Sequence, residues 1–433
     1  MTSDVFLSED AFRRLKKNIA PSSKTTTWEK LLLKYLERIS LTPAQYELID
    51  GRYNTVADIL DRSSDPLLEG IIFLPQGSFR TRTVIRPENG EVDVDAVAWL
   101  PRGQGLPAKF LYQLVRDELD KGVRTEQGIE EKNRCIRVLY ADEDPAFHMD
   151  VTPARNAVCN ANADGSGELE VSDLRACENP RETGYKPSNP VDFAKWVQRA
   201  SEEDVYVLEK YDGSIEFREA AKAEPLPSHS DLTAFDPLRA TIKMLKAHRD
   251  RYFSLAGNAK QKPISVLLTT LACHSYLRVA HASTGQPMRP IDAITAIIDE
   301  LPRCFDQPRQ GEQYRVENPV SRDENFAERW NDDQMLVLAF RSWHGQISRD
   351  IRLGLLGFDS KGEFAEQFDR AFGHRSKSLA ESFCDESIIA DYDPLGLSLH
   401  ATDRQRNSDA IQKTFGIGAS KKSQSTEPLE RLG

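Results

Sequence analysis

Between Ile71 and Val97 the sequence reads IIFLPQGSFRTRTVIRPENGEVDVDAV, in which two apolar runs flank a polar segment. The first run ends at Leu74 and predicts a short strand that stops at the turn Pro75–Ser78. The second run alternates carboxylate and apolar side chains, which predicts a half-buried strand over Glu91–Trp99. Two strands joined through a glycine-containing turn therefore begin a small sheet.

The second strand carries two carboxylates, Asp93 and Asp95. Side chains two residues apart on a strand point to the same face, so these carboxylates lie close together. They repel each other unless a cation lies between them. Carboxylate oxygens suit Mg²⁺, which keeps several waters and takes further ligands from substrate phosphates. The strand therefore predicts a magnesium site.

A third carboxylate, Asp150, lies on a predicted strand over Phe147–Val151 and shares its face with His148. Beside the first pair, Asp150 would complete a site for two Mg²⁺ ions about 3.5–4 Å apart, in which Mn²⁺ can substitute. One ion would activate an attacking hydroxyl, and the other would hold a triphosphate and its leaving pyrophosphate. His148 is either part of this site or a hydrogen-bonding group behind it.

The turn between the strands predicts a phosphate-binding element. Gly77 lets the backbone approach a phosphate closely, and a helix that begins there would direct free N–H groups at the anion. Ser78 adds a hydroxyl donor, and we assign Gln76, Gly77 and Ser78 to nucleotide binding. The basic segment that follows either meets phosphates or is simply exposed; it comprises Arg80, Arg82 and Arg86.

The order Gly77-Ser78, Asp93-Val-Asp95 and Asp150 resembles the polymerase-β-like nucleotidyltransferase superfamily. Five segments are more narrowly similar to the bacterial cGAS-like nucleotidyltransferases (CD-NTases), the cyclic-oligonucleotide synthases of CBASS anti-phage systems. These segments are QGSFRTRTVIRP, EVDVDAVAWL, FHMDVTPA, DPLRATIKMLKAHRDRYF and NPVSRDENFAERW. The resemblance implies an α+β fold, with a nucleotidyltransferase lobe around a small mixed sheet and a helical lobe that closes the active-site cleft.

The resemblance also implies the reaction. A cyclic dinucleotide of the cyclic GMP-AMP type would be made from ATP and GTP by attack of a 2′- or 3′-hydroxyl on an α-phosphate, followed by ring closure. Two alternatives share parts of this site. One is a linear nucleotidyltransferase that modifies RNA or protein. The other is a catalytically silent nucleotide-binding regulator, which would have no need of three clustered carboxylates.

A helix predicted over Asp236–Phe253 carries basic residues on its polar face, among them Lys243 and Lys246. A solvated basic face is the ordinary interpretation. The resemblance implies instead that a lysine of this helix contacts the triphosphate, with Lys246 the first choice and Lys243 the second. It also implies that Ser265 contacts phosphate, although Ser265 equally fits a residue that starts a helix after Pro263.

Composition excludes several classes of protein. The net charge of −11 disfavours a dedicated nucleic-acid binder, and nothing matches the zinc ribbon of the animal DNA sensor, so activation by DNA is not expected. The longest apolar run, Ile264–Cys273, is too short to cross a bilayer, and the start shows no apolar signal region. The six cysteines are scattered, with no Cys-x-x-Cys pair, which favours a cytoplasmic protein with packed thiols.

We expect three parts in the chain: a nucleotidyltransferase lobe with N-terminal helices over 1–230, a helical lobe over 231–403 and a flexible tail over 404–433. Periodicity predicts a helix over Asn325–Ser348, and Asp212-Gly213 suggests a hairpin within Val205–Phe217. The terminal Gly433 has two interpretations: a frayed end without a role, or a conjugation site. The resemblance implies the second, because some CBASS operons encode, besides an effector, a ubiquitin-transfer-like partner that acts on the synthase's C-terminus.

Overall fold

The computed structural model describes residues 23–383 apart from 89, 142, 158–161, 163, 204–223, 284–287, 306–312, 357, 359, 374 and 375. All of the described residues fall within one unit of the chain. The predicted hairpin within Val205–Phe217 and the tail that ends in Gly433 lie outside them. No helix in the described ranges is both long and apolar enough to cross a membrane.

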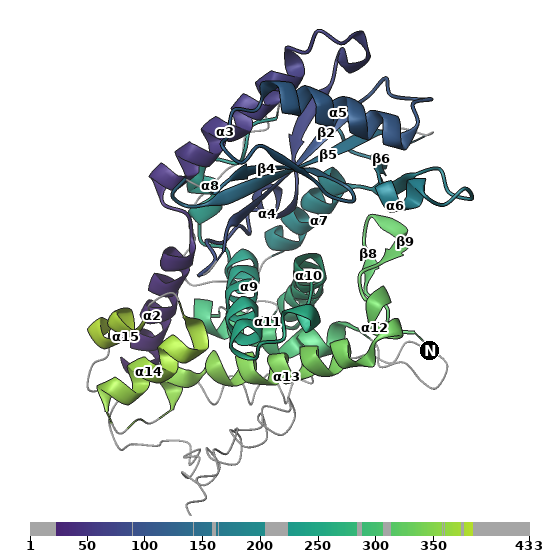
Figure 1. Cartoon of the computed structure of the whole chain (residues 1–433). Coiled ribbons are helices and arrows are strands. Elements are labelled where there is room, and N and C mark those ends of the chain that lie inside the picture. Colours follow the sequence, from purple (N-terminus) through teal and green to yellow (C-terminus); the bar gives the residue numbers. More distant parts are fainter. Residues whose placement is uncertain are drawn as a thin grey trace, which may run out of the picture. The chain divides into compact units, whose positions relative to one another are not determined.

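A mixed sheet forms one half of the described structure (Figure 1). Its strands follow the order β1-β2-β5-β4-β3, and β6 joins β5 to β7. β2 runs parallel to β5, whereas the other neighbours in this sheet are antiparallel. The strands are β1 (Ile72–Pro75), β2 (Val92–Leu100), β3 (Ile129–Glu131), β4 (Ile136–Tyr140), β5 (Phe147–Asn156), β6 (Leu169–Ser172) and β7 (Tyr185–Ser188).

The two faces of this sheet differ in what covers them. Val92, Val94 and Ala96 of β2 point into a buried core shared with α3 and α5. Because side chains alternate along a strand, Asp93 and Asp95 point the other way. On that side lie α4 and α7 (Figure 1). The helices of this half are α3 (Pro43–Asp61), α4 (Gly77–Arg80), α5 (Ala108–Gly122), α6 (Leu174–Cys177), α7 (Pro190–Glu202) and α8 (His229–Thr233).

The remaining helices pack around a second core. This core includes the first described helix: Trp28 of α2 packs edge-on against Phe368 at a ring-centroid distance of 5.7 Å. The Trp28 indole also donates to the carbonyl of Ile351 at 2.9 Å. The helices are α2 (Ser23–Ile39), α9 (Pro237–Leu255), α10 (Ser265–Ala282), α11 (Pro290–Glu300), α12 (Glu328–Asp332), α13 (Gln334–Asp350), α14 (Lys361–Phe372) and α15 (Lys377–Phe383).

These elements confirm the strands predicted around the carboxylates and the predominance of helices after residue 236. The single helix predicted over Asn325–Ser348 is wrong. Asp333 accepts a hydrogen bond from the backbone N–H of Met335 at 2.9 Å, and this cap starts a new helix, α13. Upstream, Glu317–Asn318 (β8) and Ser321–Asn325 (β9) form a small antiparallel hairpin.

Candidate active site

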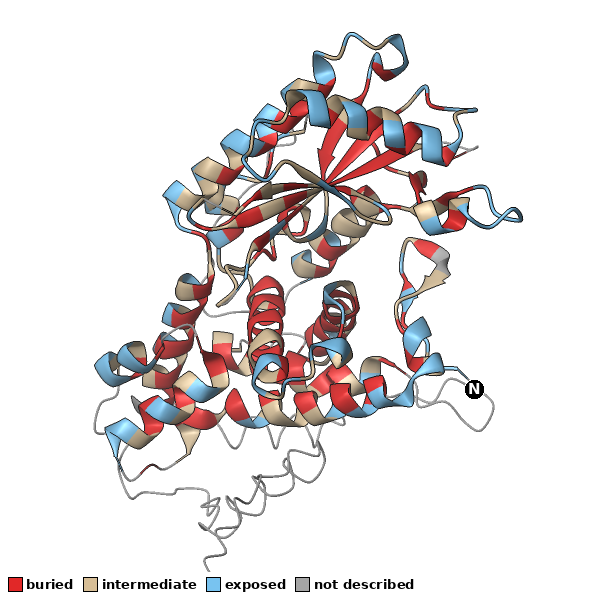
Figure 2. Cartoon of the chain, in the orientation of Figure 1, coloured by how far each residue is buried: buried red, intermediate tan, exposed pale blue. Residues whose placement is uncertain are grey.

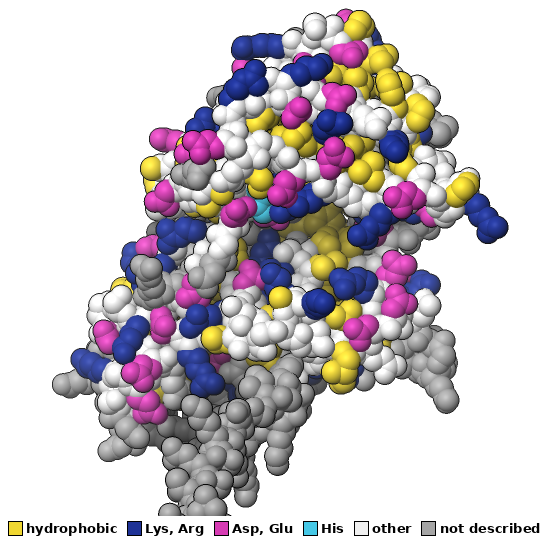
Figure 3. All heavy atoms as spheres, viewed as in Figure 1, with side chains coloured by type: hydrophobic (Ala, Val, Ile, Leu, Met, Phe, Trp, Pro, Cys, Tyr) yellow, Lys and Arg dark blue, Asp and Glu magenta, His cyan; other side chains and the backbone are white. Residues whose placement is uncertain are grey.

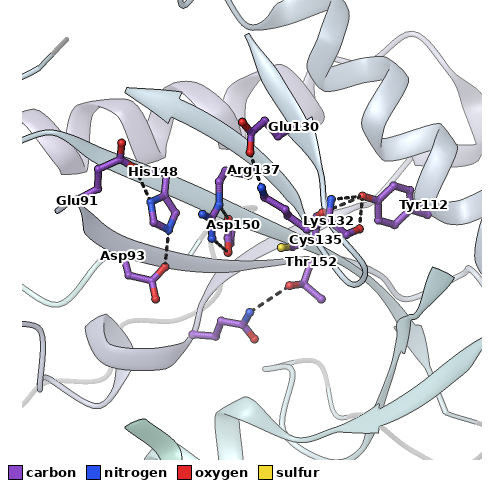
Figure 4. A network of polar contacts seen from close by, with 11 residues as sticks. Glu91, Asp93, Tyr112, Glu130, Lys132, Cys135, Arg137, His148, Asp150 and Thr152 are labelled. Carbon is purple, nitrogen blue, oxygen red and sulfur yellow. Dashed lines mark hydrogen bonds and ion pairs between the residues drawn. The ribbon is translucent and has the colours of Figure 1, made fainter. Parts of the chain in front are cut away.

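Strand pairing brings the predicted acidic residues into one patch of the sheet. In the parallel register of β2 and β5, Asp93 lies opposite His148 and Asp95 lies opposite Asp150. In the antiparallel register of β5 and β4, Asp150 lies opposite Arg137. The three predicted carboxylates therefore share a patch with a histidine and an arginine on neighbouring strands. Figure 4 shows Asp93, Asp150, His148 and Arg137 of this patch.

His148 bridges two carboxylates (Figure 4). Its Nδ1 lies 2.8 Å from Oε2 of Glu91, and its Nε2 lies 3.0 Å from Oδ1 of Asp93. Burial disfavours the charged form of each group. At His148 the hydrogen bonds to Asp93 and Glu91 outweigh burial, so the pKa of His148 is raised. At Asp93 the hydrogen bond from His148 and the charge of His148 outweigh burial, so the pKa of Asp93 is lowered. Glu91, which we did not predict as a site residue, thus holds His148 in place.

The surroundings of Asp95 disfavour its charged form. Burial raises its pKa to about 8, and repulsion from Asp93 and Asp150 adds to the effect. Ligand atoms of Asp93, His148 and Asp150 lie within 4.8 Å of one another. A cation would relieve this concentration of negative charge, and carboxylate oxygens are the donors that Mg²⁺ and Mn²⁺ prefer. The donor set therefore fits a divalent metal.

The turn at Gly77 lies directly against Asp95. Gly77 adopts a positive φ of 59°, and the backbone N–H of Gln76 donates to the carbonyl of Asp95 at 2.9 Å. Gln76 directs its side-chain amide at Thr152 Oγ1, at 3.3 Å, and so fixes the turn to the sheet. The one-turn helix α4 begins here, and Gly77 and Ser78 both line the cleft described next.

A cleft of about 970 Å³ lies between the carboxylate face of the sheet and the helices α9 and α10. Figure 3 shows the hollow, with Lys and Arg side chains gathered at its rim. The described residues around the cleft include acidic, basic, aromatic and uncharged polar side chains. They include the carboxylates Glu91, Asp93, Asp95 and Glu324; the basic residues Arg137, His148, Lys246, Arg249 and Lys262; the aromatic residues Phe193 and Phe326; and the polar residues Ser265 and Asn318.

Lys246 and Lys243 are buried, so the alternative interpretation of their side of α9 as a solvated basic face is wrong. Figure 2 shows α9 buried over most of its length. Lys246 lines the cleft and donates to the carbonyl and to Oγ1 of Thr83, at 3.1 and 2.9 Å. Burial, together with repulsion from Arg249, lowers the pKa of Lys246 to about 7. Lys243 donates instead to the carbonyl of Leu232 and is not among the described residues that line the cleft.

Ser265 opens α10 at the cleft, and its hydroxyl accepts a hydrogen bond from Nη1 of Arg249 at 3.0 Å. Arg249 was not predicted as a site residue. The available signal was its spacing: it follows Lys246 by three residues, which places both on one side of a helix. Two arginines of the predicted basic segment form contacts outside the cleft: Arg80, the last residue of α4, pairs with Glu224 at 2.8 Å, and Arg86 donates to the carbonyl of Arg38 at 2.9 Å.

Part of the chain matches a known family, and its fold is similar to that of several solved structures. Residues 72–153 match the family described as cyclic GMP-AMP synthase DncV-like, nucleotidyltransferase domain. The CD-NTase CdnG of Bradyrhizobium diazoefficiens, solved in complex with GTP, is 20% identical, with a TM-score of 0.58 over 82% of this chain and 98% of CdnG. CdnC of E. coli MS115-1, solved as a CdnC:HORMA-deltaN complex, is 10% identical, with a TM-score of 0.52 over 80% of this chain and 96% of CdnC.

E. coli DncV in its 3′-deoxy GTP bound form is 15% identical, with a TM-score of 0.49 over 86% of this chain and 92% of that chain. No curated protein matches the chain. The stretch from β1 into β5 is therefore similar to the nucleotidyltransferase domain of the DncV-like family. The described structure has the α+β, polymerase-β-like fold of the bacterial CD-NTases, which confirms the resemblance seen in the sequence.

Proposed function

We propose that this protein is a cyclic dinucleotide synthase that joins ATP and GTP into a product of the cyclic GMP-AMP type in anti-phage defence. One observation carries the proposal: Asp93 and Asp95 line a single cleft with the Gly77-Ser78 turn and Lys246, and Asp150 lies opposite Asp95 on the neighbouring strand. The match to a DncV-like nucleotidyltransferase domain supports the same conclusion.

The three carboxylates are the proposed metal ligands. Asp93 and Asp95 would hold two Mg²⁺ ions, and Asp150 would bind one of them. When bound, the ions supply the positive charge that activates the attacking hydroxyl and stabilises the departing pyrophosphate. His148, held by Glu91, fixes the position of the Asp93 carboxylate beside them. The protein otherwise contributes positioning and electrostatic stabilisation.

Basic and hydroxyl groups on the opposite wall of the cleft suit a triphosphate. Lys246, Arg249 and Ser265 line this wall, and Ser78 and the backbone of Gly77 lie on the sheet side. The N–H groups of a helix start and cationic side chains are the groups that bind phosphate. In this arrangement Lys246 would exchange its bond to Thr83 for a phosphate oxygen.

The aromatic residues of the cleft suit nucleobases. Phe193 and Phe326 meet edge-on at a ring-centroid distance of 6.1 Å, and bases stack on such rings. Beside them, Asn318 donates to Oε2 of Glu324 at 2.7 Å and holds that carboxylate in place. A carboxylate accepts hydrogen bonds from N1–H and the 2-amino group of guanine, whereas adenine offers no donor at N1. This chemistry supports GTP as one substrate.

The size of the cleft is consistent with two nucleotides. Its volume of about 970 Å³ lies at the upper end of the range for small-molecule sites, about 300–1,000 Å³. A linear nucleotidyltransferase would need one nucleotide and an open path for a macromolecular acceptor. A silent regulator would need no metal-binding carboxylates.

The deciding experiment is incubation of the protein with all four nucleoside triphosphates and Mg²⁺ or Mn²⁺, followed by mass spectrometry. A phosphatase-resistant cyclic product that contains guanine and adenine is expected. A linear product, or nucleotide transferred to added RNA or protein, would support the first alternative. Nucleotide binding without metal and without turnover would support the second.

Further parts of the proposal concern partners and organisation. A CBASS effector would respond to the product, and a ubiquitin-transfer-like partner would join Gly433 to a target in the cytoplasm, without activation by DNA. Co-expression with the neighbouring operon proteins tests the conjugation, because an adduct should form with the wild type and not with a Gly433-deleted chain. The lobe boundaries near residues 230 and 403 remain a prediction.

A further inference from the structure

Arg137 on β4 covers the carboxylate of Asp150 (Figure 4). Its Nε donates to Oδ1 at 2.7 Å and its Nη2 donates to Oδ2 at 2.8 Å, so one guanidinium engages both oxygens. The side chain of Arg137 is 27% exposed and that of Asp150 is 14% exposed. Of the two residues, Arg137 is the one that lines the cleft. The guanidinium thus stands between the cleft and the third carboxylate.

This pairing competes with metal binding. Paired N–H···O bonds between a guanidinium and a carboxylate are among the stronger hydrogen bonds in proteins. A divalent cation on Asp150 would need one of the same two oxygens, and it would be repelled by the guanidinium a few ångströms away. Asp150 can therefore take a metal only when Arg137 releases at least one oxygen.

Phosphate is the natural second partner for Arg137. The forked donors of a guanidinium match phosphate oxygens as well as they match a carboxylate. Arg137 lies in the same cleft as Lys246 and Ser265, where the proposed function places the nucleotide phosphates. A bound nucleotide would thus offer Arg137 an alternative to Asp150.

We propose that Arg137 is a positioning residue that occupies Asp150 in the resting protein and releases this carboxylate to the metal when nucleotide phosphate binds. Loading of the metal at Asp150 then depends on the nucleotide, so metal alone does not assemble the site. This inference rests on the proposed function, because it requires Asp150 to be a metal ligand.

The test measures Mn²⁺ binding without turnover, from the electron paramagnetic resonance signal of the free ion, with and without a nonhydrolysable GTP analogue. The wild type should bind Mn²⁺ about tenfold more tightly with the analogue than without it. Without the analogue, Arg137→Gln should bind Mn²⁺ about tenfold more tightly than the wild type and should gain less from the analogue. Arg137→Lys keeps the charge but loses the forked pair of donors, so its Mn²⁺ affinity should lie between those of the wild type and Arg137→Gln. It replaces Arg137→Gln in the test if that variant does not fold.

The matched control is Arg155→Gln. Arg155 forms a similar cross-strand pair on the same sheet, with its Nε 2.7 Å from Oε2 of Glu170, and it is not among the described residues of the cleft. Its Mn²⁺ affinity should match that of the wild type. Unchanged or weaker Mn²⁺ binding by the Arg137 variants, with cyclic product still made by the wild type, would overturn this inference alone. Absence of Mn²⁺ binding by every protein would overturn it together with the proposed metal site.

Discussion

Gly77 lies against Asp95 so closely that a Cβ atom at position 77 would stand 2.0 Å from Oδ2 of that carboxylate. The backbone of Gly77, which we propose binds phosphate, is therefore in contact with the side chain of Asp95, which we propose binds the metal. The φ of Gly77 is 59°, a conformation that side-chain-bearing residues rarely adopt. The glycine is thus required both for the turn and for the space that Asp95 occupies.

Gly77→Ala should reduce the rate of product formation by at least about 100-fold, because it displaces Asp95 and the phosphate-binding turn together. Gly70→Ala is the matched control. Gly70 also has a positive φ, 79°, but nothing lies within 4 Å of a Cβ there. Both variants should lose about 1 kcal/mol of stability from the backbone conformation, as measured by urea unfolding. Equal activity in the two variants would contradict the role given to Gly77.

Asp93→Asn or Asp95→Asn should abolish turnover. Each change removes a negative metal ligand and nearly preserves its shape. Since metal ions supply several kcal/mol of transition-state stabilisation and each 1.4 kcal/mol is tenfold in rate, the loss should be at least about 100-fold. Chromatography of the products measures it. Asp95→Asn should not lower the melting temperature, because it relieves repulsion from Asp93 and Asp150. A folded variant with wild-type activity would refute the metal-site assignment.

Lys246→Met should raise the KM for nucleotide by about tenfold or more, since a hydrogen bond to a charged group contributes about 1.5–3 kcal/mol. Steady-state kinetics with varied GTP and ATP measure the effect. Lys243→Met is the matched control, because Lys243 lies one helical turn away and directs its ammonium at the carbonyl of Leu232. A larger KM effect from Lys243→Met would reverse the assignment of the two lysines.

Lys243 should also make stability depend on pH. Burial lowers its pKa from 10.5 to about 8, so between these values the unfolded chain binds more protons than the folded one. The free energy of unfolding therefore rises with pH in this window, by up to about 1.4 kcal/mol per pH unit. Below pH 8 the buried charge destabilises the fold, and Lys243→Met should be the more stable protein there. Urea unfolding between pH 7 and pH 10 checks this, and an advantage of the variant that does not shrink as the pH rises would be inconsistent with it.

Glu324→Gln should shift the base preference away from guanine. An amide offers one donor and one acceptor, which suits adenine, so the GTP-to-ATP ratio of kcat/KM should fall about tenfold. Glu317→Gln on the same hairpin is the control, since Glu317 is exposed and pairs with Arg315. Competition between the two nucleotides measures the ratio. An unchanged ratio in Glu324→Gln would remove this residue from base recognition.

Local patterns were enough to predict the carboxylate face. The alternation around Asp93 and Asp95 determines which side chains share a face, and this depends only on the strand itself. The partners of these residues depend on register. His148 lies opposite Asp93, and Arg137 lies opposite Asp150, because of the register in which β2, β5 and β4 pair. No local pattern in the sequence predicts that register.

The lysines of α9 show a second limit of sequence patterns. An amphipathic helix is expected to turn its polar side to solvent. Here α9 lies between the helical core and the sheet half, so Lys243 and Lys246 are buried although they lie on the polar side. The hairpin that carries Glu324 lies before the helix predicted over Asn325–Ser348 and depends on a bond between separate residues: Asn325 accepts from the backbone N–H of Val316 at 2.9 Å.

The packing of Trp28 against Phe368 sets an order for assembly during synthesis. Every strand of the large sheet has been made once Ser188 is added, so that half of the molecule can fold while the chain is still being extended. The helix that carries Trp28 leaves the ribosome before the sheet strands, yet its aromatic partners on α14 are among the last described residues to follow. Until they arrive, the side of α2 that packs against α14 stays exposed, and exposed apolar surface of this kind favours aggregation.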